Sequence, residues 1–312
     1  MSADHSNRLT VVPSAADINN VDGLLKNSTS TSNKAGSPKK RPPKLPLTAK
    51  IVDPHSRLKK ASPFLLNENP WRRYWGVWEK DQAGTGILAY ENVKSFPVVF
   101  ITEREPPKLK VQLLRLKEIS HANIVHLKQA YLSDKSIFFV YESMQASLAQ
   151  LEGTPYVSFN EADIATVCKE LLQGLKHIHD DLRIAHGSLN CDNVLIAGDG
   201  TVQIANIGDS LLDGGDPDRK QRDMKDVGLI AVRLKERGTS LDNPETLTLR
   251  EPENASAEVK DFIQRSSAVP SHTLLQHEFL LKSPGPWCLK PYLLEAEPYI
   301  YEHRRHIENN VH

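Results

Sequence analysis

Apolar residues recur at spacings of three and four along residues 160–180. The stripe comprises Ile164, Val167, Cys168, Leu171, Leu172, Leu175 and Ile178. This spacing is typical of an amphipathic α-helix with one face on a core. Asn160 can cap its start, with Glu161 and Asp163 in the first turn. The pattern predicts a helix with Cys168 in the core and with His177 and His179 on the surface near its end.

Two short runs, Val194–Ile196 and Thr201–Ile204, predict a hairpin. The segment between them, residues 197–200, ends in Asp-Gly, a strong signal for a tight turn. A polar cluster precedes the hairpin (HGSLNCDN, 186–193), and the triplet Asn-Ile-Gly follows it at 206–208. The hairpin therefore separates two groups of side chains that have the chemistry of a site.

Residues 63–104 alternate aromatic and β-branched runs with breaks at 83–86 and at Pro97, which predicts an antiparallel sheet. A further buried strand is predicted over SIFFVYESM, residues 136–144. Between these segments, Val111, Leu114 and Ile119 favour a helix that stops at residues 120–123.

Composition gives ordinary values, with 39% hydrophobic and 25% charged residues among 312. No apolar run reaches the ~20 residues of a membrane helix, and the first residues have no apolar core typical of a signal peptide. The three cysteines form neither a disulfide framework nor a metal-ligand pattern, which favours a reduced, cytoplasmic protein.

The zero net charge conceals an asymmetry: residues 34–60 carry +8, whereas residues 61–312 carry −7. Residues 1–62 are polar, basic and rich in proline and serine, so we expect a disordered tail. Its PKKRPPK cluster leaves nuclear import open, and Lys40–Pro46 fits an SH3-type polyproline ligand. A purely solvated tail remains the alternative. Nothing in the sequence predicts specific nucleic-acid binding.

The polar clusters around the hairpin resemble the catalytic core of eukaryotic protein kinases. In that family HRDLKxxN supplies a base and a magnesium ligand, and DFG supplies a second ligand. HANIV (121–125) is similar to the family's HPNIV turn. CKELLQGLKHIHDD (168–181) and LLQHEFL (274–280) resemble the PAK and Ste20-like serine/threonine kinases.

The resemblance implies an α+β, bilobal fold over residues 63–282. A small β-rich lobe would span about 63–142, and a mainly helical lobe with a truncated activation segment about 143–282. Residues 283–312 match nothing in the family and form an extension. They would be either a partner-binding tail or a strap that packs Trp287 and Tyr292 onto the domain.

The chain departs from the catalytic motifs of the family. Ser188 replaces the HRD aspartate, Asn190 replaces the lysine after it, and Asn206 replaces the DFG aspartate, whereas Asn193 is kept. A hydroxyl cannot accept a substrate proton as a carboxylate does, and a positioned base contributes about 10²–10⁴-fold in rate. A neutral amide is a poor Mg²⁺ ligand, so Asn193 is only a residual metal candidate.

The resemblance also assigns residues to the nucleotide pocket. Thr102 falls on the phosphate-binding lysine, Gln112 on its glutamate partner, and Tyr141 on the gatekeeper, with Asn193 and Asn206 at the phosphate end. Losing both members of the ion pair leaves a neutral site, whereas losing one would leave a buried charge unpaired.

Other positions imply architecture rather than chemistry. Leu116, His186 and Ile207 fall on the hydrophobic spine of the family, and Asp226 on the residue that braces the HRD backbone. The activation segment has no APE motif, so only a short acidic and basic loop would separate Gly208 from the helix at Asp226.

These substitutions favour a catalytically inactive kinase-like domain, a pseudokinase that acts as a protein-binding scaffold or allosteric regulator in signalling. The resemblance suggests an active kinase or a small-GTPase pathway component as the partner. We expect no cofactor on this hypothesis. The alternative retains ATP and Mg²⁺ as switch ligands with residual or atypical phosphotransfer.

Overall fold

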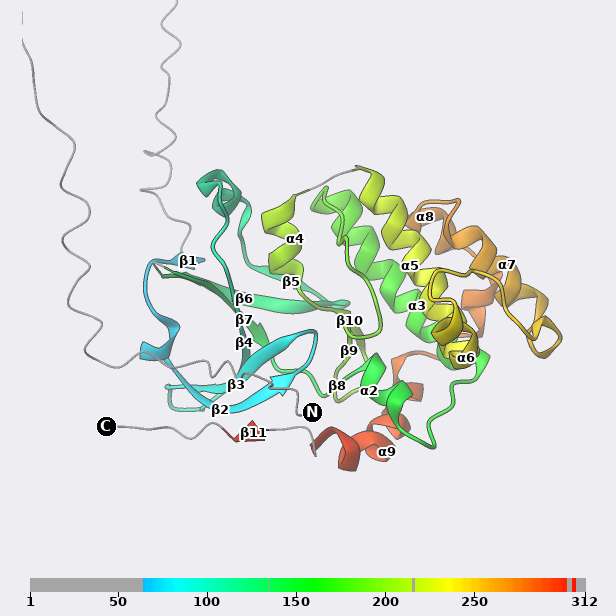
Figure 1. Ribbon diagram of the computed structural model, residues 1–312, viewed down its shortest axis with the longest axis horizontal. Coiled ribbons are helices and arrows are strands. Elements are labelled where there is room, and N and C mark those ends of the chain that lie inside the picture. The colour runs from blue at the N-terminus through cyan, green and yellow to red at the C-terminus, as the bar shows by residue number, and fades with distance from the viewer. Residues whose placement is uncertain (1–63, 134, 215–216, 302–304, 307–312) are drawn as a thin grey trace, which may run out of the picture. The chain divides into compact units, whose positions relative to one another are not determined.

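The computed structural model describes residues 64–133, 135–214, 217–301 and 305–306. The predicted tail, residues 1–62, lies outside the described residues together with its import signal and the Lys40–Pro46 motif. Within the described part, strands gather on one side of the domain and helices on the other (Figure 1).

The strands form one continuous ladder in the order β11-β2-β3-β4-β7-β6-β10-β9-β8, with β1 and β5 also paired to β6. The first six are β1 (Leu65–Leu66), β2 (Tyr74–Asp81), β3 (Thr85–Glu91), β4 (Val98–Arg104), β5 (Ile119–His121) and β6 (Ile124–Leu132). The others are β7 (Ile137–Glu142), β8 (Ala146–Ser147), β9 (Val194–Ile196), β10 (Val202–Ile204) and β11 (Arg305–His306).

The antiparallel sheet predicted for residues 63–104 is confirmed. Strands β2, β3, β4, β7 and β6 pair antiparallel in that order. Side chains alternate between its two faces. One face carries an apolar cluster that includes Val99, Ile101 and Val140 and is partly covered by Leu66 and Trp71. The other face contributes to the main core that it shares with the helices.

The helical part follows the sheet in sequence. Its α-helices are α2 (Leu148–Gly153), α3 (Glu161–Lys176), α4 (Ile207–Asp213), α5 (Pro217–Lys235), α6 (Arg237–Asp242), α7 (Ala257–Ser266), α8 (Ser271–Leu274) and α9 (Lys290–Tyr301). Shorter turns of helix are η2 (Pro70–Arg72), η3 (Lys110–Arg115), η4 (His177–Asp181), η5 (Pro252–Asn254), η6 (Glu278–Lys282) and η7 (Pro286–Leu289). The α+β, two-lobed architecture is thus confirmed.

Helix α3 is the predicted amphipathic helix. The Asn160 side chain accepts hydrogen bonds from the backbone of Ala162 and Asp163, and the Asp163 carboxylate accepts one from the Asn160 backbone N–H. Every residue of the predicted apolar stripe is fully buried. The prediction for its end was wrong for one histidine, because His179 is buried and bonded whereas His177 lies nearer the surface.

The predicted hairpin is also confirmed, with β9 and β10 antiparallel. Strand β10 pairs in parallel with β6 through Ile204 and Ile124. Since β6 belongs to the small lobe, the hairpin continues the sheet across the junction between the lobes. This pairing holds the two polar clusters against the small lobe.

The helix predicted around Val111 and Leu114 was wrong. The segment forms only the six-residue 3₁₀ turn η3, followed by β5. Leu113 and Leu116 are buried, whereas Val111 and Leu114 are exposed. Few residues lie between Pro107 and the start of β5, and a short segment gains too few hydrogen bonds to offset helix nucleation.

The segment after Gly208 was also predicted wrongly as a loop. Residues 207–213 form α4, and α5 begins at Pro217, well before Asp226. Helix α4 packs against η3, and the Arg115 guanidinium donates to the carbonyl of Leu212 at 3.2 Å. The start of the truncated activation segment is therefore helical and docked on the small lobe.

Residues 283–312 pack as a strap in their described part. Leu289, Leu293 and Ala296 enter the main core. Tyr292 donates to the Asp163 carboxylate at 2.6 Å. The expected packing of Trp287 was wrong, because its side chain is 62% exposed. At its far end β11 pairs with β2 (Figure 1), so the strap contacts both lobes.

Candidate functional site

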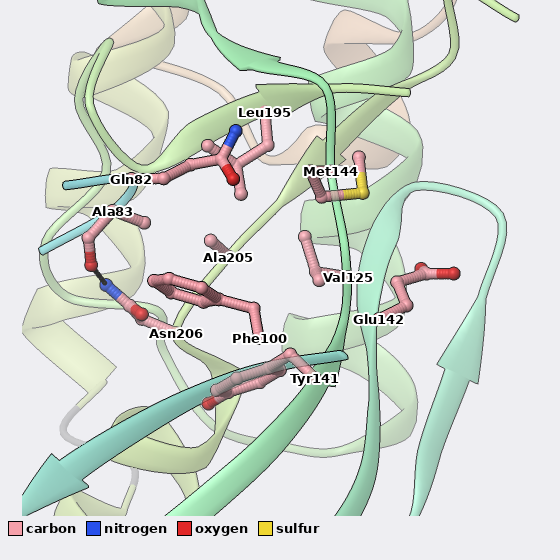
Figure 2. Close-up of a pocket in the computed structure, with 10 residues that line it drawn as sticks. All are labelled: Gln82, Ala83, Phe100, Val125, Tyr141, Glu142, Met144, Leu195, Ala205 and Asn206. Carbon is pink, nitrogen blue, oxygen red and sulfur yellow. Dashed lines mark hydrogen bonds between the residues drawn. The ribbon is translucent and has the colours of Figure 1, made fainter. Parts of the chain in front are cut away.

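The candidate site lies where the β2–β3 turn, strand β4, the end of β7 and the residues after β10 converge. Figure 2 shows the cavity there, with Ala83, Phe100, Tyr141 and Asn206 among the residues that line it. Four of the five predicted pocket residues lie in this region; Gln112 lies in η3, half-exposed.

Two aromatic side chains line the cavity. Phe100 and Tyr141 are 5% and 3% exposed, and Phe100 packs so closely on Gly86 that a Cβ there would lie 2.5 Å from the ring. The space left for the centre of a water molecule is about 10 Å³, which is what one water needs. A purine base has no room in this arrangement.

The two asparagines bond to each other. The Asn206 amide donates to the Asn193 side-chain oxygen at 3.2 Å and to the Ala83 carbonyl at 2.9 Å (Figure 2 shows the second bond). Asn193 in turn donates to the Ser188 carbonyl at 2.6 Å. Both Asn206 hydrogens are thus used, and the β2–β3 turn is tied directly to the residues after β10.

Ser188 and Asn190 lie on the exposed loop that precedes β9. The Asn190 side chain accepts from the backbone of Asp192 and Asn193 at 2.9 and 3.0 Å, so its role is to close the turn. The structure therefore places Ser188 and Asn193 together but gives Asn190 a local, structural contact.

Thr102 lies on β4 with its side chain 1% exposed and its hydroxyl without a hydrogen-bond partner in the described residues. Two positions along the same strand face, Arg104 pairs with Asp209 of α4 at 3.3 Å. Burial raises the pKa of the Asp209 carboxyl, and Arg104 opposes this effect. The motif comparison missed this pair because neither residue occupies a family motif position.

Tyr141 also connects the lobes. Its hydroxyl accepts a hydrogen bond from the backbone N–H of Gly208 at 3.0 Å. Burial strongly raises the pKa of the phenol, so it stays protonated. The predicted gatekeeper residue thus fills the cavity and also fixes the start of α4.

A second residue missed from sequence is Lys80 of β2, which is 3% exposed. Its ammonium donates to the carbonyls of Met144 and Gln145 at 3.2 and 3.3 Å, in the segment that joins the two lobes. Amphipathic alternation along β2 gives no hint that this lysine points inward.

The backbone brace predicted at Asp226 is formed by Asp223 instead. Its carboxylate accepts from the backbone of His186 at 2.8 Å and of Gly187 at 2.6 Å, and it bonds the His179 ring at 2.8 Å. Asp226 pairs with Arg222 at 2.9 Å, and burial raises its pKa to about 6.

The sequence alone could have identified Asp223 as the aspartate of this motif, by counting back from Gly228. The motif DVWSxG places a glycine five residues after its aspartate, and Gly228 stands five residues after Asp223. A Cβ on Gly228 would lie 2.0 Å from the Ser266 hydroxyl oxygen, so this position requires glycine.

The predicted spine residues are buried. Leu116 and Ile207 belong to the same apolar core. The His186 ring bonds the Ala205 carbonyl at 2.8 Å through Nε2, and its Nδ1 has no partner in the described residues. Burial lowers the pKa of His186, so the imidazole is neutral and packs rather than transferring protons.

Comparison with known proteins agrees with this geometry. Residues 93–228 match the family model described as protein kinase domain. The chain contains a protein kinase-like domain related to the Ste20 and PAK kinases. Its kinase-like domain is 29% identical over 150 residues to the serine/threonine-protein kinase pakA of Talaromyces marneffei. It is 28% identical over 182 residues to ste20 of Emericella nidulans, and 36% over 99 residues to CLA4 of Candida albicans.

These matches cover 45%, 55% and 31% of this chain, but only 23%, 20% and 10% of the respective relatives. The kinase-like chain thus corresponds to a minor part of each relative's length. Among the described residues, no helix is long and apolar enough to cross a bilayer.

Protein kinases bind ATP with Mg²⁺, but the residues of this kinase-like domain do not fit that ligand. Phe100 lines a cavity of only about 10 Å³, Thr102 offers no charge, and Asn193 and Asn206 bond each other. The described residues also contain no cluster of three or more acidic, histidine or cysteine side chains suited to a metal ion.

Proposed function

We propose that this chain is a catalytically inactive kinase-like domain, a pseudokinase, that acts as a protein-binding scaffold or allosteric regulator in signalling. The hydrogen-bonded chain Ala83–Asn206–Asn193–Ser188 carries the proposal. It joins, through neutral groups, positions where an active kinase needs a base and metal ligands.

Phosphoryl transfer depends on positioning and on charge that stabilises the transferred group. Ser188 supplies no base, Thr102 supplies no cation, and Asn206 supplies no carboxylate. Each replacement is neutral, and the Asn206 side chain is bonded to protein groups, so the site carries little unpaired charge. This pattern supports a domain that is stable without ligand rather than one that awaits it.

Three contacts between the lobes support a binding role. Asn206 bonds the Ala83 carbonyl, Gly208 bonds the Tyr141 hydroxyl, and Arg104 pairs with Asp209. These bonds fix the lobes in one relative position, and a preorganised surface binds a partner at lower entropic cost. A component of a small-GTPase pathway or an active kinase is the partner class that kinship with ste20 and CLA4 favours.

A second candidate function is a nucleotide switch with residual phosphotransfer. It rests on Asn193 and Asn206, which lie side by side at the two metal-ligand positions of the family. For it to operate, Phe100 would have to leave the cavity and both amides would have to exchange their bonds for a cation.

The thermal unfolding midpoint of the full chain tests the choice, measured with and without millimolar ATP, each with Mg²⁺ and with EDTA. A ligand at 100 times its dissociation constant stabilises a native protein by about 2.7 kcal/mol. We expect no shift. A shift that depends on Mg²⁺ and disappears in Asn193→Ala would overturn the scaffold proposal and favour the switch.

Phe100→Ala tests whether the phenyl ring closes the pocket. We expect it to lower the free energy of unfolding by about 3–5 kcal/mol, the usual cost of a buried Phe→Ala cavity. Adenosine should restore part of that stability, and ATP with Mg²⁺ should restore no more, because the phosphate-binding charges are missing. Phe262→Ala, a fully buried position in the helical lobe, is the matched control.

Denaturant titration with and without adenosine measures both effects. If adenosine stabilises neither variant, the Phe100 ring only packs in the core, and the cavity that its removal leaves does not bind a nucleoside. If Mg²⁺·ATP stabilises Phe100→Ala far more than adenosine does, the phosphate end still functions and the scaffold proposal fails.

A further inference from the structure

One segment combines exposed apolar side chains with positive charges that no acidic side chain of the described residues pairs. We name residues 108–117, KLKVQLLRLK, the basic ridge. Its apolar residues Leu109, Val111 and Leu114 are 63%, 60% and 50% exposed. Exposed large apolar groups gathered in one place mark interaction sites more often than scattered ones do.

The 3₁₀ geometry of η3 explains why these side chains are presented together. Residues three apart lie on one face of a 3₁₀ helix. Val111 and Leu114 are therefore neighbours on the solvent face, whereas Leu113 and Leu116 lie on the buried face. The exposed pair is a consequence of the fold rather than of fraying.

The basic ridge is anchored to the domain by contacts of its buried face. Leu113 and Leu116 belong to the main core, η3 packs on α4, and Arg115 donates to the Leu212 carbonyl. A surface that is already ordered loses little conformational freedom on binding.

The charge of the basic ridge favours an acidic partner. Lys108, Lys110, Arg115 and Lys117 are all exposed and give the segment +4, although residues 61–312 as a whole carry −7. None of the four forms an ion pair within the part of the chain that the structure describes. An acidic partner would pair these cations and cover the apolar side chains between them.

We propose that the basic ridge is the docking site for an acidic amphipathic helix of a partner protein. The partner's leucine-type residues would cover Val111 and Leu114, and its carboxylates would pair with the surrounding cations. A protein fits better than an anionic membrane, because the exposed carboxylates Glu105 and Glu118 close both ends of the segment. A lipid surface would repel both, whereas a helix can avoid them.

The inference deepens the scaffold proposal, and its test uses no nucleotide, so either can fail alone. The probe is a fluorescein-labelled peptide about five helical turns long, with Leu at spacings of three and four and Glu elsewhere. Fluorescence anisotropy measures its binding to the full chain. The same peptide with Lys in place of Glu, and vesicles of phosphatidylserine and phosphatidylcholine, are probed in parallel.

Two double variants test the two parts of the surface. Val111→Gln with Leu114→Gln removes the apolar pair, and Lys108→Glu with Lys110→Glu reverses charge. The matched controls are Leu241→Gln with Leu294→Gln, which are exposed elsewhere, and Lys94→Glu with Lys135→Glu. We expect each ridge variant to weaken binding roughly tenfold or more and the controls to leave it unchanged.

Every other result overturns the proposal. Equal loss in the controls would mean that binding is nonspecific. Binding of the lysine peptide would exclude charge selection. Vesicle binding that is lost in the Val111 and Leu114 variant would assign the surface to a membrane. A dimer by light scattering that the same variant dissolves would assign it to a second copy of the chain.

Discussion

The candidate site around Asn206 and the support beneath His186 and Gly187 belong to the same kinase-like domain but differ in the charges that they carry. At the first, on our proposal, the neutral residues Thr102, Ser188 and Asn206 stand where an active kinase carries charged ones. At the second, Asp223 still joins His179 and the backbone of residues 186 and 187. The first group serves a reaction and the second holds backbone in place.

The difference shows which charges the fold itself requires. A buried charge that loses its partner destabilises a protein strongly, whereas a set of charges removed together does not. On our proposal the charges of the candidate site were lost as a set, and Asn193 and Asn206 bond each other there. Asp223 cannot change in this way, because two of the groups that donate to it are backbone N–H groups, which every residue except proline carries.

The largest expected effect comes from breaking the support. Asp223→Ala leaves the N–H groups of His186 and Gly187 and the His179 ring without their acceptor. We expect the free energy of unfolding to fall by about 3–5 kcal/mol, the typical cost of removing one partner of a buried charged network. Urea denaturation of the full chain measures it.

Asp226→Ala serves as the matched control on the same helix, because Asp226 bonds only Arg222 among the side-chain contacts described. If both variants lose equal stability, Asp223 has no special role in supporting the backbone. The contrast drawn between the two regions would then be wrong.

A smaller effect is expected from placing the aspartate of the kinase DFG motif at position 206 of the candidate site. Asn206→Asp places a carboxylate against two acceptors, the Ala83 carbonyl and the Asn193 side-chain oxygen. Without donors the contacts become repulsive, and we expect a loss of about 1–3 kcal/mol. Asn190→Asp, on the exposed loop, should change stability little.

Thermal unfolding with and without millimolar Mg²⁺ distinguishes the outcomes for Asn206→Asp. No effect of the ion is expected. Recovery of stability with Mg²⁺ in this variant, but not in Asn190→Asp, would reveal a metal site that a single residue suppresses.

The smallest effect concerns Asp226 and depends on pH. Burial raises its pKa in the folded protein to about 6, from 3.8. The folded state therefore holds the proton more tightly, so this group lowers stability as pH rises from about 4 to about 6. Asp226→Asn removes the buried charge and loses one half-exposed contact with Arg222. We expect a gain of about 1–2 kcal/mol at pH 7 that disappears near pH 4.

Denaturation of wild type and Asp226→Asn at several pH values tests this linkage. A gain that stays constant from pH 7 to pH 4 would contradict a titrating Asp226 and leave a simple packing effect.

Periodic patterns predicted the elements that are shaped by local sequence. The α3 stripe and the Asp-Gly turn of the β9–β10 hairpin were placed correctly, because burial of an apolar face and turn chemistry decide them. The segment at Val111 was misjudged, since tertiary packing selected Leu113 and Leu116 for the core instead.

The side chains around the cavity include residues that lie outside the family motifs. The resemblance to the kinase motifs assigned Thr102, Asn193 and Asn206 to the pocket. Phe100 and Lys80 occupy ordinary strand positions. Only the folded sheet shows that Phe100 lines the cavity and that the Lys80 ammonium donates to the Met144 carbonyl. Asp223 was missed by a register error of one helical turn.

The strap has a consequence for the handling of the protein. Strand β2 would form the outer border of the sheet if β11 did not pair with it. Uncovered strand borders offer free N–H and C=O groups to other chains and promote aggregation. Trp75 and Tyr90, a cross-strand pair beside this border, are 57% and 41% exposed. Shortening the chain before Arg305 is therefore expected to yield protein that self-associates, with its helical core unchanged.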